Sequence, residues 1–571
     1  MDRLRITQNE IVLGNMPSNA SPKTHIASGP WCFYNQEQKF KDWENTFTFA
    51  PEPLTNIDLL EKAAKQAQTL CIAIIPKLKE FLSQSSSLPD SYWYTLLTPW
   101  AINMAKLIVE RTYRVEAMIS QWKDHSLTIQ LLPKTCKFYF EDEASFVLHG
   151  SLGVTFNHWL FSRLLENICP TTWNKQYLPS VEEIFKNHKN TNLISNVKSK
   201  LKSVHLKLLF PKLKGISIWQ AIFFSLALLN NNSKQDNSID LTSYIKDSEN
   251  TSLKLLCNPF DLFKSVIPNS ILNLSHPTKI DKCSKSHLRV ASVVSYEDAN
   301  YRQKLAIWKA QGNRLAYIQH GGNYGQVRFG CDIPIVEYNQ HAFFTWGWDN
   351  HGKEKGNFIP MPYPQLSKIA DLYTQKTNDL LFIGTEMSIY PYRLDSHPSP
   401  LQTLDYRHKK QIFLENLSDR ILQNCLYRPY FNIPGTFTEA PWIKDKFPNL
   451  KISKGNLLPQ MLGCRLLVID HHGTTMLEAM AANIPMILFW NEKAWPLTDK
   501  CNEYLKLLKG ANIWFSNPID AAKHINYIWD NPISWWNSQN IQNIRQQFCK
   551  NYAFTINNNE NFLWYKILRK I

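Results

Sequence analysis

The sequence predicts an α/β protein in which two α/β units face each other across a cleft and a mainly helical region precedes them. From residue 287 onward, short apolar runs of strand length alternate with segments of helical periodicity. This alternation is typical of βαβ units built around parallel sheets. The first 180 residues instead carry aromatic and aliphatic side chains at helical spacing, as in the segment from Tyr92 to Arg111.

Composition excludes several classes of protein. The 571 residues are 44% hydrophobic and 19% charged, so a disordered or fibrous chain is excluded. The 11 cysteines are scattered from Cys32 to Cys549 without a C-x-x-C pair, which indicates reduced thiols and neither a disulfide scaffold nor a zinc ribbon. A net charge of +15 suits an anionic partner such as a nucleic acid, an anionic membrane or a phosphorylated substrate.

No membrane-spanning or export segment is expected. Residues Met1 to Arg5 lack the apolar core of a signal peptide. The most apolar stretch, Gly215 to Leu229, is too short to cross a bilayer. We therefore expect a soluble, cytoplasmic protein.

The N-terminal part offers fewer signals. Glu10 to Gly14 is predicted to be a short strand that ends in a turn, and Cys71 to Pro76 fits either a strand or a buried helix. Residues 230–251 are polar and are predicted to be a surface insertion or a long loop.

A first βαβ unit begins near residue 288. Leu288 to Val294 is a predicted strand, and Asp298 to Gln311 is a predicted helix that ends at Gly312. The next strand, Leu315 to Ile318, runs directly into the loop Gln319-His320-Gly321-Gly322-Asn323. Ligands bind beyond the carboxyl ends of such strands.

A second α/β series follows a proline-containing segment. The predicted strands are Leu380–Ile383, Leu466–Ile469 and Met486–Phe489, and the predicted helices are Met476–Asn483, 520–529 and 539–553. The predicted domains are residues 1–349, a linker over 350–378, a second α/β domain over 379–530 and C-terminal helices over 531–571.

The strongest candidate site follows the strand Leu466–Ile469. His472, Gly473, Thr474 and Thr475 join this strand to a helix N-terminus, where free N–H groups and the helix dipole favour a phosphate. The alternative is that Thr475-x-x-Glu478 is only a capping box that starts the helix. Glu478 either caps this helix or hydrogen-bonds a ribose.

His320 is the candidate catalytic residue. A histidine at the carboxyl end of a strand, beside Gly321 and Gly322, suits a general base or an oxyanion donor. The alternative is a histidine hydrogen-bonded within a tight turn. His471 and His472 are adjacent and point apart in an extended chain, so we expect no metal site.

Two further residues are candidates for contact with the same ligand. Arg428 precedes Pro429 after a short apolar run and can reach a phosphate or carboxylate, although a surface arginine is the simpler interpretation. His397 lies in the loop Ser396-His397-Pro398, after the first strand of the second unit, where a nucleotide could be clamped.

A basic segment lies between Ile184 and Lys214, with eight lysines and no acidic residue. Val197, Leu201, Val204 and Leu208 fall at helical spacing. Residues 184–214 therefore fit either an amphipathic helix in peripheral contact with an anionic membrane, at the inner face of the cytoplasmic membrane, or the solvated face of a helix.

Several motifs resemble those of a bacterial transferase family encoded in O-antigen and surface-polysaccharide gene clusters. The resemblance covers most of the chain and is most specific in its C-terminal half. The motifs are Gly29-Pro30-Trp31-Cys32, Pro99-Trp100, Gln319 to Gly325, Thr345-Trp346-Gly347-Trp348, Asp470 to Ala479, Asn483-Ile484-Pro485, Phe489-Trp490, Ile528-Trp529-Asp530 and Trp535 to Ser538.

That family is similar in layout to GT-B glycosyltransferases, including Kdo-type and sialic-type transferases, and to the polyol-phosphate polymerases of teichoic acid. The resemblance implies a GT-B-like fold of two Rossmann-like domains, a catalytic or orienting role for His320, and phosphate contacts from Thr474 and Thr475. The sequence has His472-Gly473 where we expect Asn-Ser in relatives.

The predicted function is glycosyl transfer from a nucleotide-activated sugar to a glycan or lipid-linked glycan acceptor. We expect a CMP-type donor with a Kdo-like or nonulosonic acid, no cofactor and no metal. The N-terminal domain would hold the acceptor and the second domain the nucleotide. The alternatives are a CDP-polyol phosphotransferase of the same fold, and a non-catalytic basic protein that binds nucleic acid. The aromatic residues follow predicted cores and no nucleic-acid-binding motif is present, so we expect no nucleic-acid partner.

Overall fold

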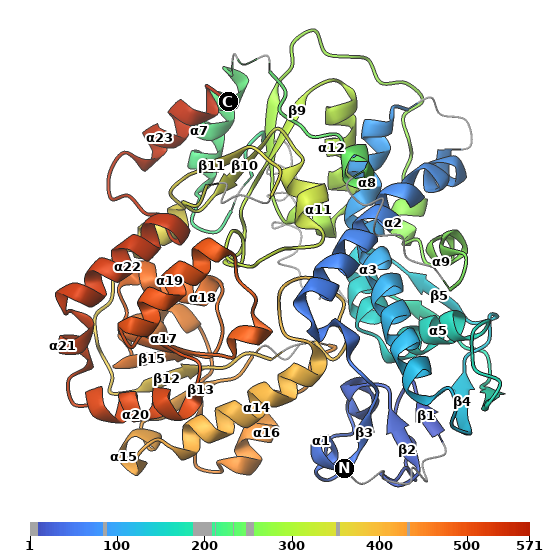
Figure 1. Ribbon diagram of the computed structural model, residues 1–571. Coiled ribbons are helices and arrows are strands. Elements are labelled where there is room, and N and C mark those ends of the chain that lie inside the picture. Colours follow the sequence, from blue (N-terminus) through green and yellow to red (C-terminus); the bar gives the residue numbers. More distant parts are fainter. Residues whose placement is uncertain are drawn as a thin grey trace.

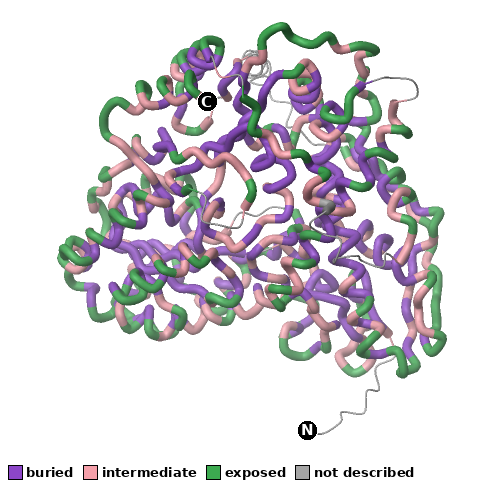
Figure 2. The backbone as a smooth tube through the Cα atoms, turned by 45° about the horizontal axis from the view of Figure 1, so that its top comes forward, coloured by how far each residue is buried: buried purple, intermediate pink, exposed green. Residues whose placement is uncertain are grey.

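In its described residues, the computed structural model contains three parallel β-sheets of four to six strands, each in its own lobe, and a smaller two-stranded sheet (Figure 1). Buried residues fill the lobes and the regions where the lobes meet, and exposed residues follow the periphery (Figure 2). The predicted basic segment 184–214 lies mostly outside the residues that the structure describes. Those residues are 10–83, 88–186, 208–211, 213–231, 233, 235–246, 256–349, 354–386, 388–430 and 434–571.

The N-terminal lobe holds a parallel sheet of order β3-β2-β1-β4-β6. Its strands are β1 (Glu10–Val12), β2 (His25–Ala27), β3 (Thr48–Phe49), β4 (Leu127–Leu131) and β6 (Trp173–Tyr177), and a separate pair joins β5 (Lys137–Phe140) to β7 (Glu182–Phe185). The helices of this region are α1 (Trp43–Thr46), α2 (Ile57–Ser83), α3 (Asp90–Trp122), α4 (Glu143–Ser145), α5 (Val154–Leu165), α9 (Pro259–Lys264) and α10 (Asn269–Leu272).

The predicted strand at Glu10–Gly14 is confirmed as β1, and Cys71–Pro76 is helical because it lies within α2. The helical prediction for the first 180 residues missed the rest of the sheet. Its strands are two to five residues long, and β6 is a polar edge strand in which only Trp173 is buried. Such short strands carry too few alternations to be recognised from sequence.

The middle lobe contains the predicted βαβ unit. Its sheet has the order β11-β10-β9-β8, with β8 (Leu288–Ala291), β9 (Arg314–Ile318), β10 (Ala342–Thr345) and β11 (Phe358–Pro360). The Asp298 side chain caps helix α12 (Ala299–Ala310), and Gly312 ends the connection with φ +87°. The short helices α8 (Thr242–Lys246) and α11 (Val294–Glu297) also belong to this region, and α8 lies in the predicted insertion 230–251.

The C-terminal lobe is a doubly wound sheet of order β14-β13-β12-β15-β16-β17. Its strands are β12 (Leu380–Ile383), β13 (Cys425–Arg428), β14 (Lys451–Ile452), β15 (Leu466–Ile469), β16 (Met486–Phe489) and β17 (Trp514–Phe515). The strand order reverses between β12 and β15, and ligands of doubly wound sheets bind outside the carboxyl ends of the strands at such a point. The second unit therefore has the Rossmann-like topology that the sequence predicted.

Helices surround this last sheet and connect it to the middle lobe (Figure 1). They are α14 (Pro400–Glu415), α15 (Asp419–Leu422), α16 (Glu439–Lys446), α17 (Leu457–Gly463), α18 (Thr474–Ala482), α19 (Asp499–Gly510), α20 (Pro518–Ile528), α21 (Pro532–Trp536) and α22 (Gln539–Tyr552). The last helix, α23 (Glu560–Leu568), returns to the middle lobe and covers one face of its sheet together with α7 (Ile218–Leu229). The segment predicted as a linker, 350–378, contains β11 and helix α13 (Pro364–Ile369).

Candidate functional site

The two loops that the sequence singled out lie in direct contact. The loop after β9 and the loop after β15 meet where the Gly322 N–H donates to Thr474 Oγ1 over 3.0 Å. A Cβ atom on Gly322 would lie 2.3 Å from the carbonyl carbon of Gly473 and from the Thr474 nitrogen, so only glycine permits this approach. The neighbouring Gly321 carbonyl accepts a hydrogen bond from the Gln319 side chain (2.8 Å).

The N-terminus of α18 has the form of an anion site. Gly473 is its N-cap, with φ +147° and no side chain to occupy the first N–H groups. Thr474 is exposed and Thr475 is half-buried, so both lie near solvent. The capping-box alternative is wrong, because the Glu478 carboxylate turns to Lys214 Nζ (2.6 Å) of another lobe.

His320 is part of a cluster of groups that hydrogen-bond one another. The Tyr324 hydroxyl lies 3.1 Å from His320 Nδ1 and donates to Glu337 Oε1 over 2.8 Å. The Tyr296 hydroxyl donates to the same carboxyl oxygen over 2.8 Å. Burial lowers the pKa of His320 to about 4 and raises the pKa of Glu337 to about 8. All four side chains are therefore neutral at pH 7; we call them the neutral cluster.

Sequence reasoning found His320 and missed its partners. Tyr324 is inside the motif that carried the resemblance, four residues after His320. Glu337 was detectable as a single carboxyl within the apolar run Ile335-Val336-Glu337-Tyr338. An isolated acid in an apolar run is a signal for a buried, partnered carboxyl group.

Charged side chains from two lobes surround His320. The loop after β12 brings Arg393, an exposed residue whose charge further lowers the pKa of both His320 and His397. On the middle lobe, Asp332 lies 3.6 Å from Lys106 Nζ and acts on His320 in the opposite direction. Arg393 is therefore near both His320 and the predicted residue His397, whose role as a clamp stays a prediction.

His397 and His472 approach the same indole. Their ring centroids lie 6.1 Å and 4.5 Å from that of Trp495. His472 is only 2% exposed, and within the described part of the chain neither of its ring nitrogens has a hydrogen-bond partner. Burial lowers the pKa of each ring to about 3. The structure therefore places His472 as a neutral packing ring behind the loop, whereas Gly473 and Thr474 face the contact with Gly322.

Arg428 lies apart from His320, in a group of side chains near the point where the strand order of the C-terminal sheet reverses. Arg428 ends β13, is half-buried and donates to Ser453 Oγ over 3.4 Å. Between β12 and β15, the Thr385 N–H donates to Asp470 Oδ2 over 3.1 Å. Lys410 Nζ lies 3.5 Å from the same carboxylate, and it also pairs with Glu439.

We call Lys410, Glu439 and Asp470 the ionic network. All three side chains are at most 1% exposed. Burial by itself would lower the pKa of Lys410, but the two carboxylates hold it above its ordinary value. The network fixes the start of the loop that carries Gly473 and Thr474.

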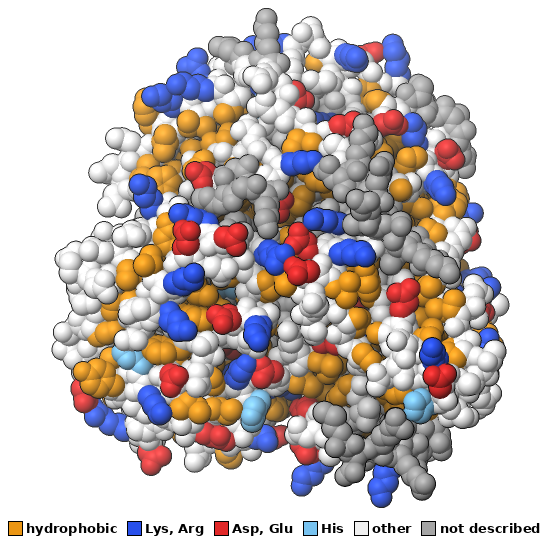
Figure 3. Space-filling view, viewed as in Figure 1, with side chains coloured by type: hydrophobic (Ala, Val, Ile, Leu, Met, Phe, Trp, Pro, Cys, Tyr) orange, Lys and Arg blue, Asp and Glu red, His pale blue; other side chains and the backbone are white. Residues whose placement is uncertain are grey.

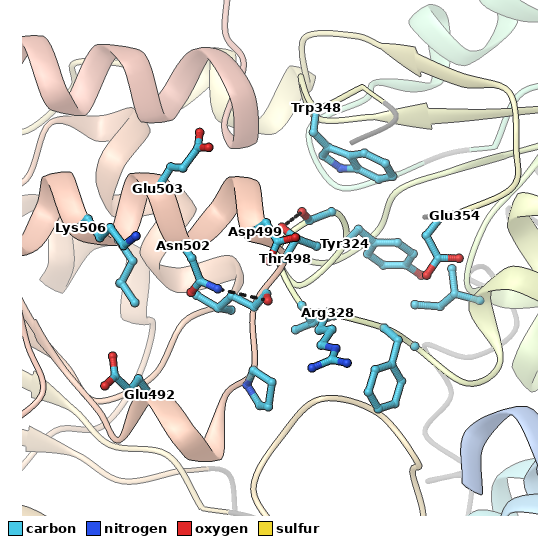
Figure 4. Close-up of a pocket in the computed structure, with 18 of the residues that line it drawn as sticks. Tyr324, Arg328, Trp348, Glu354, Glu492, Thr498, Asp499, Asn502, Glu503 and Lys506 are labelled. Carbon is cyan, nitrogen blue, oxygen red and sulfur yellow. Dashed lines mark hydrogen bonds between the residues drawn. The ribbon is translucent and has the colours of Figure 1, made fainter. Parts of the chain in front are cut away.

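A cavity of about 1140 Å³ opens beside this contact, between the middle and C-terminal lobes (Figure 4). Tyr324 lines it, so the residue that contacts His320 also borders the cavity. Ion pairs with Asp58 and Glu61 hold Arg328 at its wall, and burial raises the pKa of Glu354 to about 7. In Figure 4, helix α19 presents Asn502, Glu503 and Lys506 from the opposite side.

In the ranges that the structure describes, no group of three or more His, Cys, Asp or Glu side chains could hold a metal ion.

Comparison with known proteins gives one extensive match. A family model described as LIC12162 family transferase matches residues 9–568. No curated protein matches the sequence significantly. Among solved structures, the crystal structure of WaaG, a glycosyltransferase involved in lipopolysaccharide biosynthesis, is 11% identical and has a TM-score of 0.24. That alignment covers 77% of this chain and 99% of WaaG.

Proposed function

The chain belongs to the LIC12162 family of transferases, and from this membership we propose that it is a GT-B-type glycosyltransferase that moves a sugar from a nucleotide donor to a bacterial surface polysaccharide or O-antigen acceptor. The observation that carries the proposal is the contact between the loop of His320 and the N-terminus of α18. It brings a proton acceptor from one lobe beside an anion site from the other.

The donor phosphate would occupy the N-terminus of α18. The first N–H groups of this helix, the hydroxyls of Thr474 and Thr475 and the positive end of the helix dipole favour negative charge there. Arg393 adds a positive charge from the loop after β12. These groups would stabilise the phosphate as it leaves, which is the main demand of nucleotide-sugar chemistry. A CMP-type donor with a Kdo-like or nonulosonic acid is part of the proposal and derives from the resemblance stated above.

The acceptor would enter from the cavity of about 1140 Å³ that Tyr324 borders. Its hydroxyl oxygen bonds to the anomeric carbon while the bond from that carbon to the donor phosphate breaks. His320 takes the hydroxyl proton, and the nucleotide leaves with the bonding electrons. Because burial keeps His320 neutral at pH 7, the ring can accept a proton.

Tyr324 and Glu337 are positioning residues in this scheme. The hydroxyl proton of Tyr324 is directed to Glu337, so its oxygen can accept an N–H from the imidazole. The Tyr324 oxygen lies 3.1 Å from Nδ1 and 3.2 Å from Nε2, so either ring nitrogen can donate to it, and the nitrogen without a proton keeps the lone pair that would take the hydroxyl proton.

Thermal unfolding with CMP, CDP, UDP, GDP and dTDP tests the proposal. A ligand that binds only the native state raises the melting temperature by mass action. We expect a selective shift with CMP that the double variant Thr474→Ala/Thr475→Ala loses. The matched control is Thr46→Ala/Thr55→Ala, which removes two exposed threonines of the N-terminal lobe and leaves the shift intact. No shift with any nucleotide would contradict the proposal, and the mass of the product identifies the transferred group.

A further inference from the structure

Helix α7 exposes an apolar face. Ala221, Phe224 and Leu228 are buried against the middle sheet. The opposite side of the same helix carries large apolar side chains at helical spacing. These are Trp219 (76% exposed), Phe223 (40%), Leu226 (49%) and Leu229 (50%). A water-soluble surface helix carries polar residues at such positions, so this face is suited to another apolar surface.

Helix α23 extends the same surface. Its Tyr565 ring stacks on Phe223, with ring centroids 4.8 Å apart, and Asn561 accepts a hydrogen bond from Gln220 over 2.8 Å. Phe562, at the start of α23, is 66% exposed. These contacts join the two helices into one continuous surface, and Figure 1 shows them side by side. We call Trp219, Phe223, Leu226, Leu229 and Phe562 the α7–α23 face.

Positive charge borders this face. Helix α7 contains no charged residue, and Phe562 on α23 is followed by the exposed residues Lys566, on the same helix, and Arg569 and Lys570, directly after it. In sequence, α7 also follows residues 184–214 with their eight lysines and no acidic residue. In Figure 3, hydrophobic side chains and Lys or Arg side chains gather over the corner where these two helices lie.

The acidic group of α23 offsets only part of this charge. The Glu560 carboxyl accepts a hydrogen bond from Ser367 (3.0 Å), and burial raises its pKa to about 7. The face and its border therefore combine apolar side chains, a tryptophan and cations. This combination suits the boundary between the headgroups and the acyl chains of an anionic bilayer.

We propose that the α7–α23 face docks on an anionic lipid bilayer, with α7 lying in the plane of the interface. Among the described residues no helix is long and apolar enough to cross a membrane, so the contact is peripheral. Trp219, Leu226 and Phe562 insert at the level of the headgroups, and Lys566, Arg569 and Lys570 attract anionic lipids. The proposal does not depend on the transferred group, because it concerns a surface on the outer side of the middle sheet.

Co-sedimentation of the full-length protein with vesicles tests the docking surface. We expect binding to phosphatidylcholine vesicles that contain phosphatidylglycerol and much weaker binding to phosphatidylcholine alone, with a loss of binding in high salt. The variant Trp219→Gln/Leu226→Gln should lower the partition coefficient at least about tenfold, since it removes two large apolar side chains from the interface. The variant Lys566→Glu/Arg569→Glu should abolish the preference for phosphatidylglycerol.

The matched control is Tyr527→Gln/Leu372→Gln, which removes two exposed apolar side chains (86% and 54% exposed) that are not part of this face and should bind vesicles like the wild type. The thermal unfolding transition of each variant shows whether it is folded, and the shift of that transition with nucleotide separates a failure of docking from a failure of the transferase proposal. Absence of vesicle binding by the wild type, or equal binding to both vesicle types, would overturn the proposal. A dimer that Trp219→Gln/Leu226→Gln dissociates, without vesicle binding, would assign the face to a second copy of the chain instead.

Discussion

The carboxyl edges of the middle and C-terminal sheets face each other but hold their polar groups in opposite ways. At the middle sheet, the neutral cluster of His320, Tyr324, Tyr296 and Glu337 is uncharged at pH 7, because burial shifts each pKa toward the neutral form. At the C-terminal sheet, the ionic network holds the pKa of Lys410 above its ordinary value, because its ammonium group lies against the carboxyl groups of Glu439 and Asp470. Uncharged hydrogen-bonded groups can exchange protons, whereas fixed charges hold a loop in place. In the proposed function, proton transfer belongs to the edge with the neutral cluster and anion binding to the edge with the ionic network.

Removal of the proposed base tests the first edge most directly. His320→Ala should lower turnover by about 10²–10⁴-fold, the usual contribution of a general base. The nucleotide-induced melting shift should persist, since the phosphate site lies on the other lobe. His408→Ala, an exposed histidine of α14, is the matched control and should retain activity. Near-normal turnover of His320→Ala would show that His320 is not the base and that proton transfer does not occur at this edge.

Removal of one charge tests the second edge. Lys410→Met should lower the free energy of unfolding by about 3–5 kcal/mol, because Glu439 and Asp470 would remain buried without compensation. Urea denaturation measures this difference. The adjacent Lys409→Met breaks only a partly exposed pair with Asp405 and should cost less than about 1 kcal/mol. Equal losses in the free energy of unfolding for the two variants would show that the charge of Lys410 does not stabilise the network.

The pH dependence of stability distinguishes the two edges more finely. Burial raises the pKa of Glu337 from 4.5 to about 8, so between these values the folded protein holds a proton that the unfolded chain has released. The contribution of this proton to the free energy of unfolding is complete below pH 4.5 and is lost as the pH rises toward 8. Glu337→Gln has no such proton. Its free energy of unfolding should therefore rise relative to wild type by about 1.4 kcal/mol per pH unit in this window and level off above it.

Urea denaturation from pH 5 to 9 measures this difference. Glu503→Gln, an exposed carboxylate of α19, is the control and should show a constant difference from wild type. A constant difference for Glu337→Gln as well would mean that Glu337 is ionised in the folded protein, and the neutral cluster would then be wrongly described.

The candidate site was predictable in part. His320, Gly322, Gly473 and Thr474 were identified because glycine and hydroxyl residues directly after buried apolar runs are local signals. Arg393 was not identified, because an arginine in an irregular loop has no periodicity that distinguishes it from a surface arginine. His472 looked like part of the phosphate loop, but its orientation toward Trp495 depends on a loop 23 residues away in sequence. Its role in nucleotide binding stays a prediction.

The sequence by itself determined the elements whose signals are local. Apolar runs and helical periodicity defined β8, β9, β12, β15, β16, α12, α20 and α22, because hydrogen bonds and side-chain periodicity act within a few residues. The tertiary structure decided which of these distant segments contact one another. Gly322 and Thr474 are 152 residues apart in sequence, and the α7–α23 face joins helices more than 300 residues apart. Contacts over such separations depend on how whole sheets and helices pack, and no local pattern records that packing.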